Sequence, residues 1–438
     1  ILEYYHLLAK QVDVLGSAEA EAFTVDRRMD NTVFVTVTPA SGTDTLYART
    51  FFPDETKEIR LYGLGNEDTF TVRGESRKSI LVRIIGGKEA DRVQDFSSVK
   101  GPGKMTLIYE KDNGSVVDPG TEGRQVHSRN EKLYDYDRHA FAYNTYFPLP
   151  YVGYNADDGL VLGLGITFKR QRFGKEGFSA RHSIDLKGST AGNLQFAYEG
   201  QLHHAIGKWD IVYHGMAAYP SDFVYFYGYG NETDRSDSLF KKDYYKTRYN
   251  SIRLGAGVLR EFMRRSRFSI TVNYENNDGQ IPEHTILDVP TDILGKGKIN
   301  LLEGRAMLDL DFRNDKKFPE RGMRFFGEYV QGLITNNDNS SYNKATGFIE
   351  FHATVPLKLP LFLGLKGGGA ISSGDIPFYK LLSIGQNNYL RGYRKNRFAG
   401  KSMAFFNSDL KLQVLDIITP IVPVKFGIRG FYDLGKVY

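Results

Sequence analysis

Apolar and polar residues alternate in short segments that recur from about residue 138 to the end of the chain. The alternation is clearest over residues 193–203, 268–275, 305–313 and 425–433. Because successive side chains of a β-strand point to opposite faces of a sheet, this pattern predicts strands with one apolar and one polar face. No helical periodicity interrupts the pattern, so this part of the chain is predicted to be all-β.

No run of eighteen apolar residues occurs in the chain, which excludes transmembrane helices. A transmembrane barrel is not excluded, because its strands need only alternate apolar and polar residues over about ten positions. The 28 Tyr and 30 Phe residues favour a barrel, since aromatic side chains form girdles at both membrane interfaces. The aromatic run 223–230 is interpreted as part of such a girdle rather than as a sugar-binding platform.

A soluble sandwich would also show alternation, with its polar faces in water. Here the polar faces carry Arg, Asp, Glu and His in both signs, as expected for a lumen that holds charge pairs. The segments predict about 14 strands, too many for one small sandwich, and closure removes the free edges of so long a sheet. We therefore predict an antiparallel transmembrane β-barrel.

The first part of the chain has a different pattern. Residues 1–20 are predicted to form a short helix that ends near Gly16, and residues 23–117 to form strands separated by turns. Residues 59–63 and 82–86 resemble each other, and each segment is followed by an acidic turn and another apolar pair. A small sandwich and a few stacked coils both fit this repeat.

These patterns predict three regions of the chain. Residues 118–138 are polar and contain glycine, proline and many charges, which is typical of a linker. We expect a small β-rich domain with an N-terminal helix over residues 1–117, the linker over 118–138, and the barrel over 139–438.

Residues 381–393 read Leu-Leu-Ser-Ile-Gly-Gln-Asn-Asn-Tyr-Leu-Arg-Gly-Tyr, so the segment ends with Leu390, Arg391, Gly392 and Tyr393. This segment resembles the signature loop of the bacterial surface antigen superfamily, whose tetrad is a hydrophobic residue, Arg, Gly and an aromatic residue. The superfamily includes the central subunit of the barrel assembly machinery, two-partner secretion transporters and patatin-linked barrels.

A second motif lies upstream of the signature loop. Asp311, Arg313 and Asp315 resemble the Asp-x-Arg-x-Asp segment of the family. Pro319 and Gly322 resemble the Pro-x-x-Gly turn that follows it. The motifs agree with the family in order and spacing, and the resemblance covers about residues 148–438.

Residues 406–410 and 431–435 resemble the two family strands after the signature loop, each of which carries an inward acid. The acids are Asp409 and Asp433, and the alternation independently puts both on the polar face. The resemblance implies that Arg391 folds back into the lumen and pairs with both, as one guanidinium can fork to two carboxylates. Its implied role is structural, and the alternative is a solvated loop arginine with no fixed partner.

Family members have sixteen strands and normally end in a strand with a terminal aromatic residue. Here the strand that contains residues 431–435 runs into Tyr438, the last residue of the sequence. We therefore expect the barrel to lack its last strands. The first residues show neither a start Met nor a signal-peptide pattern, so we expect the chain to be part of a longer protein.

Residues 55–64 are similar to the segment that joins such barrels to an upstream calcineurin-like metallophosphoesterase in some fusion proteins. Residues 1–438 contain no phosphoesterase core, and they contain no Gly-x-Ser-x-Gly elbow, P-loop or His-Glu-x-x-His motif. We predict no catalytic residue and no cofactor in this chain, which leaves open whether an upstream domain makes the protein a hydrolase.

No metal site is predicted. His203 and His204 are adjacent in a predicted strand, so their side chains are expected to point to opposite faces and not to share a metal. His203 with His214 of the next strand is the alternative. Residues 86–93 partly match the calcium-binding nonapeptide repeat, but they lack its fourth-position Gly and tandem copies, which favours an ordinary turn.

Our first hypothesis for function is polypeptide assembly or translocation at the outer membrane of a Gram-negative cell, with the N-terminal domain in the periplasm. The alternatives are a membrane anchor for an upstream metallophosphoesterase and a passive structural barrel or channel. The expected partners are outer-membrane lipid and lipopolysaccharide, with a polypeptide substrate or the barrel assembly machinery as further candidates. A net charge of +5 gives little reason to expect nucleic-acid binding.

Overall fold

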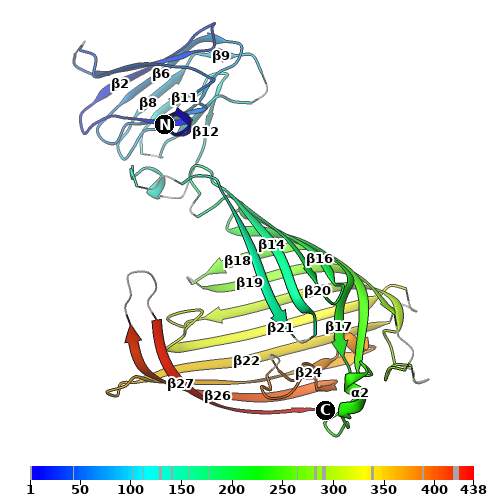
Figure 1. Cartoon of the computed structure of the whole chain (residues 1–438). Helices are drawn as coiled ribbons and strands as arrows, with labels where there is room; N and C mark the ends of the chain where they lie inside the picture. The colour runs from blue at the N-terminus through cyan, green and yellow to red at the C-terminus, as the bar shows by residue number, and fades with distance from the viewer. Residues whose placement is uncertain are drawn as a thin grey trace. The chain divides into compact units, whose positions relative to one another are not determined.

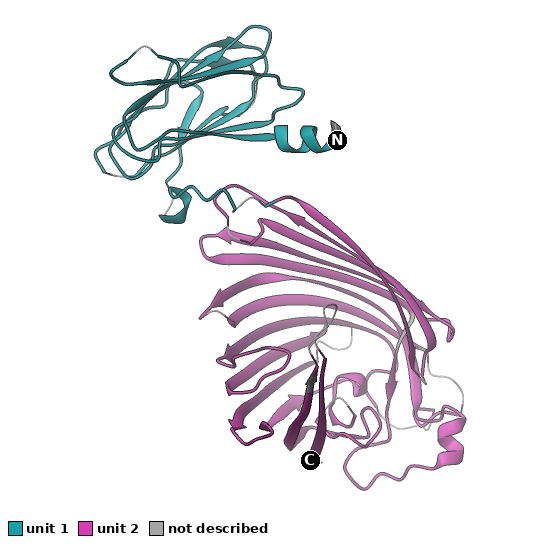
Figure 2. Ribbon diagram, turned by 60° about the vertical axis from the view of Figure 1, so that its left-hand side comes forward, with its two compact units in different colours: residues 1–142 teal, residues 143–438 magenta. Residues whose placement is uncertain are grey.

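The computed structural model describes residues 2–42, 44–101, 103–111, 113–127, 131–139, 142–155, 157–175, 177–263, 265–280, 284–288, 293–336, 340–386, 389–417 and 424–438. The chain forms two compact units, Ile1–Ala142 and Tyr143–Tyr438, which Figure 2 draws in teal and magenta. Among the described residues, no helix is both long enough and apolar enough to cross a membrane.

The first unit contains two β-sheets whose apolar side chains share one core. In order across the first sheet, the strands are β1 (Gln11–Leu15), β5 (Glu58–Tyr62), β7 (Leu81–Ile85), β10 (Thr106–Tyr109) and β12 (Gly123–Gln125). Across the second they are β11 (Val116–Asp118), β8 (Arg92–Asp95), β6 (Thr69–Ser76), β2 (Glu21–Arg27), β3 (Val33–Pro39) and β4 (Tyr47–Phe51), with β9 (Ser98–Val99) beside β6.

The fold of this unit combines the two arrangements that the sequence left open. From β5 to β8 the chain passes alternately between the two sheets, so that the sandwich is built from stacked coils. The two similar sequence segments lie side by side in parallel strands, where Ile59 pairs with Val82 and Leu61 pairs with Ile84. All four side chains are buried in the core, which explains why the apolar pattern repeats.

The ends of this unit differ from the sequence-based boundaries. Helix α1 spans Leu2–Ala9 only, because Val12 and Val14 of β1 face the core and the strand pairs with β5. The predicted linker contains β12 and a short 3-10 helix η1 (Glu131–Leu133). Strand β12 is held by main-chain pairing with β10, so it needs no apolar pattern and resembles a linker in composition.

Acidic residues form a column at the starts of three adjacent strands of the second sheet. Glu21, Asp68 and Asp91 precede residues that pair with one another across β2, β6 and β8. The N–H group of Glu21 donates to Asp68 at 2.8 Å, and that of Asp68 donates to Asp91 at 2.8 Å. Glu110 joins the column, since a side chain at Gly86 would collide with both Glu110 and Asp91.

This acidic column predicts a pH-dependent stability of the first unit. Burial, together with the charges of Asp91 and Glu21, raises the pKa of Asp68 to about 8, and burial with the Asp91 charge raises the pKa of Glu110 to about 8. The folded unit therefore holds protons that the unfolded chain, with pKa values of about 4, releases. Its free energy of unfolding should fall as pH rises from about 4 to about 8.

Hydrogen exchange of the β6 and β8 amides in the whole chain, corrected for the intrinsic exchange rate at each pH, measures this effect. Asp68→Asn keeps the acceptor for Glu21 and should flatten the pH dependence, whereas Asp54→Asn on the exposed surface should leave it unchanged. Equal protection at pH 5 and pH 8 in the unmodified chain would contradict the prediction.

The second unit is a curved antiparallel sheet of thirteen strands, each paired with the next (Figure 1). The strands are β13 (Thr145–Asn155), β14 (Gly159–Arg170), β15 (Ala180–Ser189), β16 (Leu194–Ile206), β17 (Trp209–Tyr225), β18 (Lys246–Phe262), β19 (Ser266–Gln280), β20 (Gly297–Asp311), β21 (Gly322–Ile334), β22 (Ser341–Val355), β23 (Leu361–Gly374), β26 (Ser402–Ile417) and β27 (Val424–Val437). The predicted all-β, antiparallel architecture is confirmed, with thirteen described strands against about 14 expected.

The two faces of this sheet differ in polarity as the alternation predicted. On β19, Ile270, Val272 and Tyr274 are exposed on one face, whereas Glu275 on the other is buried. The exposed apolar side chains recur on the strands around the sheet. A continuous apolar face of this kind is suited to hydrocarbon, and the opposite face, which lines the interior of the curve, is called the lumen face below.

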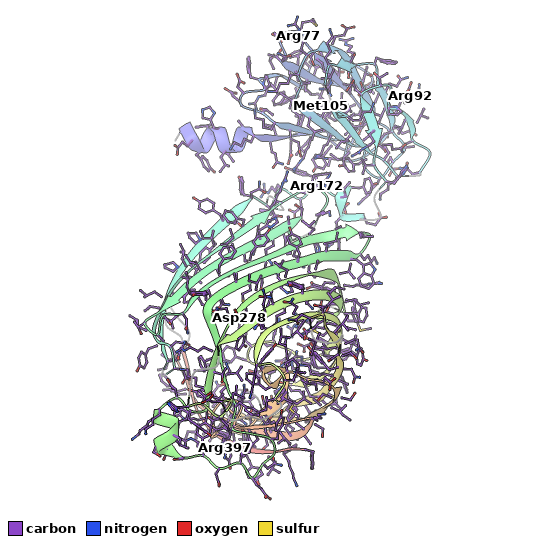
Figure 3. The ribbon with its side chains drawn as sticks, turned by 90° about the vertical axis from the view of Figure 1, so that its right-hand side faces the viewer. Arg77, Arg92, Met105, Arg172, Asp278 and Arg397 are labelled. Carbon is purple, nitrogen blue, oxygen red and sulfur yellow. The ribbon has the colours of Figure 1, made fainter. Side chains whose placement is uncertain are left out.

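The connections between strands differ in length at the two rims of the sheet. We call the strand ends at which β13 begins the proximal rim, and the opposite ends the distal rim. The distal rim carries the three longest connections, residues 226–245, 281–296 and 375–401. Arg172 of a proximal connection and Arg397 of a distal one lie at opposite ends of the sheet (Figure 3).

Candidate functional site

The connection between β23 and β26, residues 375–401, contains the signature loop and is called the lumen segment below. It includes the 3-10 helix η2 (Phe378–Lys380) and a small hairpin of β24 (Leu382–Ile384) and β25 (Phe398–Gly400). Its apolar side chains pack against residues of the distal ends of β23, β26 and β27: Leu382, Ile384 and Leu390 form one cluster with Ala370, Met403 and Val437.

The structure brings Arg391, Asp409 and Asp433 together. The Arg391 Nε and Nη2 groups donate to the two oxygens of Asp433 at 2.7 and 2.5 Å, and Nη1 donates to Asp409 at 2.7 Å. The backbone N–H of Arg391 also donates to Asp433 at 2.9 Å. Asn407 of β26 donates to the same carboxylate at 2.8 Å, and the Phe431 ring lies 4.2 Å from the guanidinium carbon.

The other residues of the predicted tetrad have distinct surroundings. Leu390 is buried in the apolar cluster, and Gly392 has a φ of +91°, a conformation that favours glycine and turns the chain after Arg391. Tyr393 is exposed, with its ring 5.2 Å from that of Phe398. Asn387 and Asn388 of the same motif lie outside the described residues.

Lys380 forms a second set of ion pairs between the lumen segment and the sheet, which the sequence analysis did not predict. Its Nζ group lies 2.5 Å from Glu275 of β19 and 3.2 Å from Glu303 of β20. Tyr342 of β22 donates to Glu303 at 2.5 Å. Lys380 belongs to no motif, and no pattern in the sequence relates it to these two acids.

The upstream motif forms a separate ion-pair group at the proximal rim. Arg313 donates to both oxygens of Asp311 at 2.8 Å and to Glu350 of β22 at 3.1 Å. Asp315 accepts from the backbone N–H groups of Lys317 and Phe318 at 2.7 and 2.8 Å. None of these described contacts reaches Arg391.

The turn of this motif depends on Gly322. Its φ is +113°, and a Cβ atom there would lie 2.5 Å from the carbonyl oxygen of Phe312 and 2.7 Å from Cα of Arg313. The backbone N–H of Phe312 donates to the carbonyl oxygen of Met323 at 2.9 Å across the same turn. Pro319 is half-buried. The motif therefore closes the β20–β21 connection rather than forming a reactive site.

A cavity of about 270 Å³ lies between the two ion-pair groups. Its lining residues come from β22, β23, β26 and the lumen segment: Glu350, His352, Gly364, Leu365, Lys366, Gln386, Tyr389, Arg391, Asn407 and Asp409. Most of these side chains are polar, and two pairs of them are in contact: His352 lies 2.8 Å from Glu350, and Arg391 donates to Asp409 at 2.7 Å. The chemistry of this interior is suited to holding strands and loops in place.

The interpretation of the aromatic run 223–230 as an interfacial girdle is wrong for its first five residues. The side chains of residues 223–227 are buried, with exposed fractions of 2–8%. Val224 and Phe226 pack against Leu287 and Phe378 of two distal connections. Those connections fold over the strand end and remove the aromatic side chains from the membrane interface.

Comparison with known proteins gives the class of this chain. Residues 217–438, half of the chain, match the Omp85 superfamily domain. The chain therefore belongs to the Omp85 superfamily, the outer-membrane barrel family that the signature loop predicted, and its sheet is an outer-membrane β-barrel fold.

Among solved structures, the chain is similar to BamA from Haemophilus ducreyi lacking POTRA domains 1-3. The identity is 14% and the TM-score is 0.47, over 67% of this chain and 58% of that chain. The chain thus spans less than two thirds of the length of that structure. No curated protein matches the chain.

The Arg391 contacts predict a large loss of stability when this side chain is removed. Asp433 is 3% exposed, and Arg391→Met would leave its carboxylate buried without a cation, at a cost of about 3–5 kcal/mol. Arg429 pairs with Asp409, and its side chain is 51% exposed, so Arg429→Met should cost at most about 1 kcal/mol. Urea unfolding in lipid vesicles measures both, and equal losses would contradict the assignment.

Proposed function

We propose that this barrel acts in the assembly or translocation of polypeptides at the outer membrane, with the first unit in the periplasm. The observation that carries the proposal is the outer edge of β13. β13 is the first strand of the sheet, and of the strands that the structure describes it pairs with β14 along one of its two edges. A strand edge with unpaired N–H and C=O groups is a template for another strand.

Two prolines weaken this edge. Pro148 and Pro150 lie opposite Ile166 and Leu164 of β14 in a continuous register. A proline is tolerated in a paired strand when its nitrogen faces away from the partner, so both rings remove a donor from the outer edge of β13. A strand paired there forms an incomplete set of hydrogen bonds, which suits a seam that opens and closes again.

The lengths of the connections support the proposed orientation. Outer-membrane barrels have short periplasmic turns and longer extracellular loops. The longest connections all lie at the distal rim, so the proximal rim is assigned to the periplasm. The chain enters β13 from the first unit at that rim, which supports a periplasmic position for this unit and a position of the distal connections beside lipopolysaccharide.

The direct test uses the native full-length protein in lipid vesicles and an unfolded eight-stranded outer-membrane barrel polypeptide as the probe. Folding of the probe is followed by its heat-modifiable gel mobility. We expect the protein to accelerate folding at least about tenfold. The double variant Pro148→Val, Pro150→Val restores both N–H donors on the outer edge of β13 and should reduce the acceleration of probe folding. Pro356→Val in an exposed connection is the control and should leave the acceleration unchanged.

The other outcomes identify the alternatives. A steady ion conductance without any acceleration of the probe would contradict the proposal and favour a passive channel. Metal-dependent phosphoester hydrolysis by the native protein, again without acceleration, would favour an anchor for an upstream enzyme.

A further inference from the structure

Two adjacent histidines lie beside a buried aspartate at the proximal rim, in the hairpin of β16 and β17. The register of this hairpin pairs Leu202 with Ile211 and Ile206 with Trp209. Residues 203–205 therefore lie opposite the single residue Asp210. This β-bulge breaks the strict alternation of a strand, so the expectation that His203 and His204 point to opposite faces is wrong. Their rings are instead stacked, with centroids 3.8 Å apart.

The bulge is held in a conformation that a histidine adopts at a cost. His204 has a φ of +48°, in the left-handed region that non-glycine residues rarely occupy. Its backbone N–H donates to Asp210 at 2.7 Å, and Lys175 donates to the carbonyl oxygens of His203 and His204 at 2.6 and 3.1 Å. Local strain that the surroundings maintain in this way often marks a functional position.

Asp210 is oriented towards the two imidazoles. Its side chain is 2% exposed, and Oδ2 lies 3.1 Å from His203 Nδ1. Gln201 donates to the same oxygen at 2.6 Å, which fixes the carboxylate. One donor atom from each of His203, His204 and Asp210 lies within 4.8 Å of the other two. In the part of the chain that the structure describes, this is the group of three such residues close enough to share an ion.

We propose that His203, His204 and Asp210 bind a divalent transition-metal ion of the zinc class. Donor atoms of a tetrahedral zinc site lie about 3.4 Å apart, so small side-chain rotations bring these three onto one ion. Two imidazole nitrogens and one carboxylate oxygen favour zinc, copper or nickel over calcium, which prefers oxygen ligands. The bound ion cross-links the bulge of β16 to the start of β17 and makes the proximal rim more rigid.

The test is a Zn²⁺ titration by calorimetry of the whole chain in detergent, purified without a polyhistidine tag and stripped of metal with EDTA. We expect one ion per chain at micromolar affinity or tighter, and a rise in the thermal unfolding temperature with Zn²⁺. Co²⁺ should give the visible absorption of a low-coordinate site, which Zn²⁺ then removes.

Three variants and one control decide the assignment. His203→Gln and Asp210→Asn each remove a donor and should weaken Zn²⁺ binding at least about tenfold. His204→Gly should do the same while relieving the positive φ, so its fold is preserved. His214→Gln is the matched control, because His214 pairs with Glu199 further along the hairpin.

The fold of each variant is checked by circular dichroism and gel mobility. Binding of Zn²⁺ by folded His204→Gly and His203→Gln with unchanged affinity would overturn the proposal. An equal loss of binding in His214→Gln, or no micromolar binding by the unmodified chain, would also overturn it.

Discussion

Hydrocarbon on one side of a β-sheet fixes where every other side chain and backbone group must go. Backbone N–H and C=O groups in lipid have to be paired within the sheet, which explains the long, regularly paired strands from β13 to β27. Apolar side chains then occupy the outer face, and charged side chains such as Glu275 and Glu303 lie on the lumen face. Charges concentrated in a partly dry interior need partners of opposite sign.

The lumen segment supplies several of those partners. Lys380 neutralises Glu275 and Glu303 of two central strands, and Arg391 neutralises Asp409 and Asp433 of the last two described strands. The same segment therefore holds two distant parts of the sheet in a fixed relation. In contrast, the outer edge of β13 carries two prolines, and in the proposed function this edge is a weak seam beside a fixed interior.

The sequence predicted the features that depend on periodic alternation and on sequence motifs, namely the strands and the Arg391 contacts. Alternation in segments such as 268–275 predicted strands because one face of each strand is apolar. The Leu390–Tyr393 tetrad predicted that Arg391 lies close to Asp409 and Asp433, and the structure places these three side chains within hydrogen-bonding distance. The first unit was recognised as β-rich, since Ile59 and Val82 repeat at equivalent positions of stacked strands.

Features that depend on local breaks in regularity or on distant contacts were not predictable. The bulge at His203 and His204 interrupts the alternation by which neighbouring side chains of a strand point to opposite faces. No sequence pattern predicts this register shift. Strand β12 pairs with β10 through its main chain and has the composition of a linker. Lys380 lies in a long connection and contacts Glu275 of a strand far away in the sequence, so no sequence spacing relates the two residues.

The central claim is that the lumen segment is held to the last strands by a specific interaction between Arg391 and Asp433. A double-mutant cycle with Arg391→Ala, Asp433→Asn and the double variant, measured by urea unfolding in lipid vesicles, isolates that interaction. The account predicts a coupling free energy of about 2 kcal/mol or more, with the double variant more stable than the sum of single losses implies. A coupling of less than about 0.5 kcal/mol would mean that the two losses are independent and would contradict the claim.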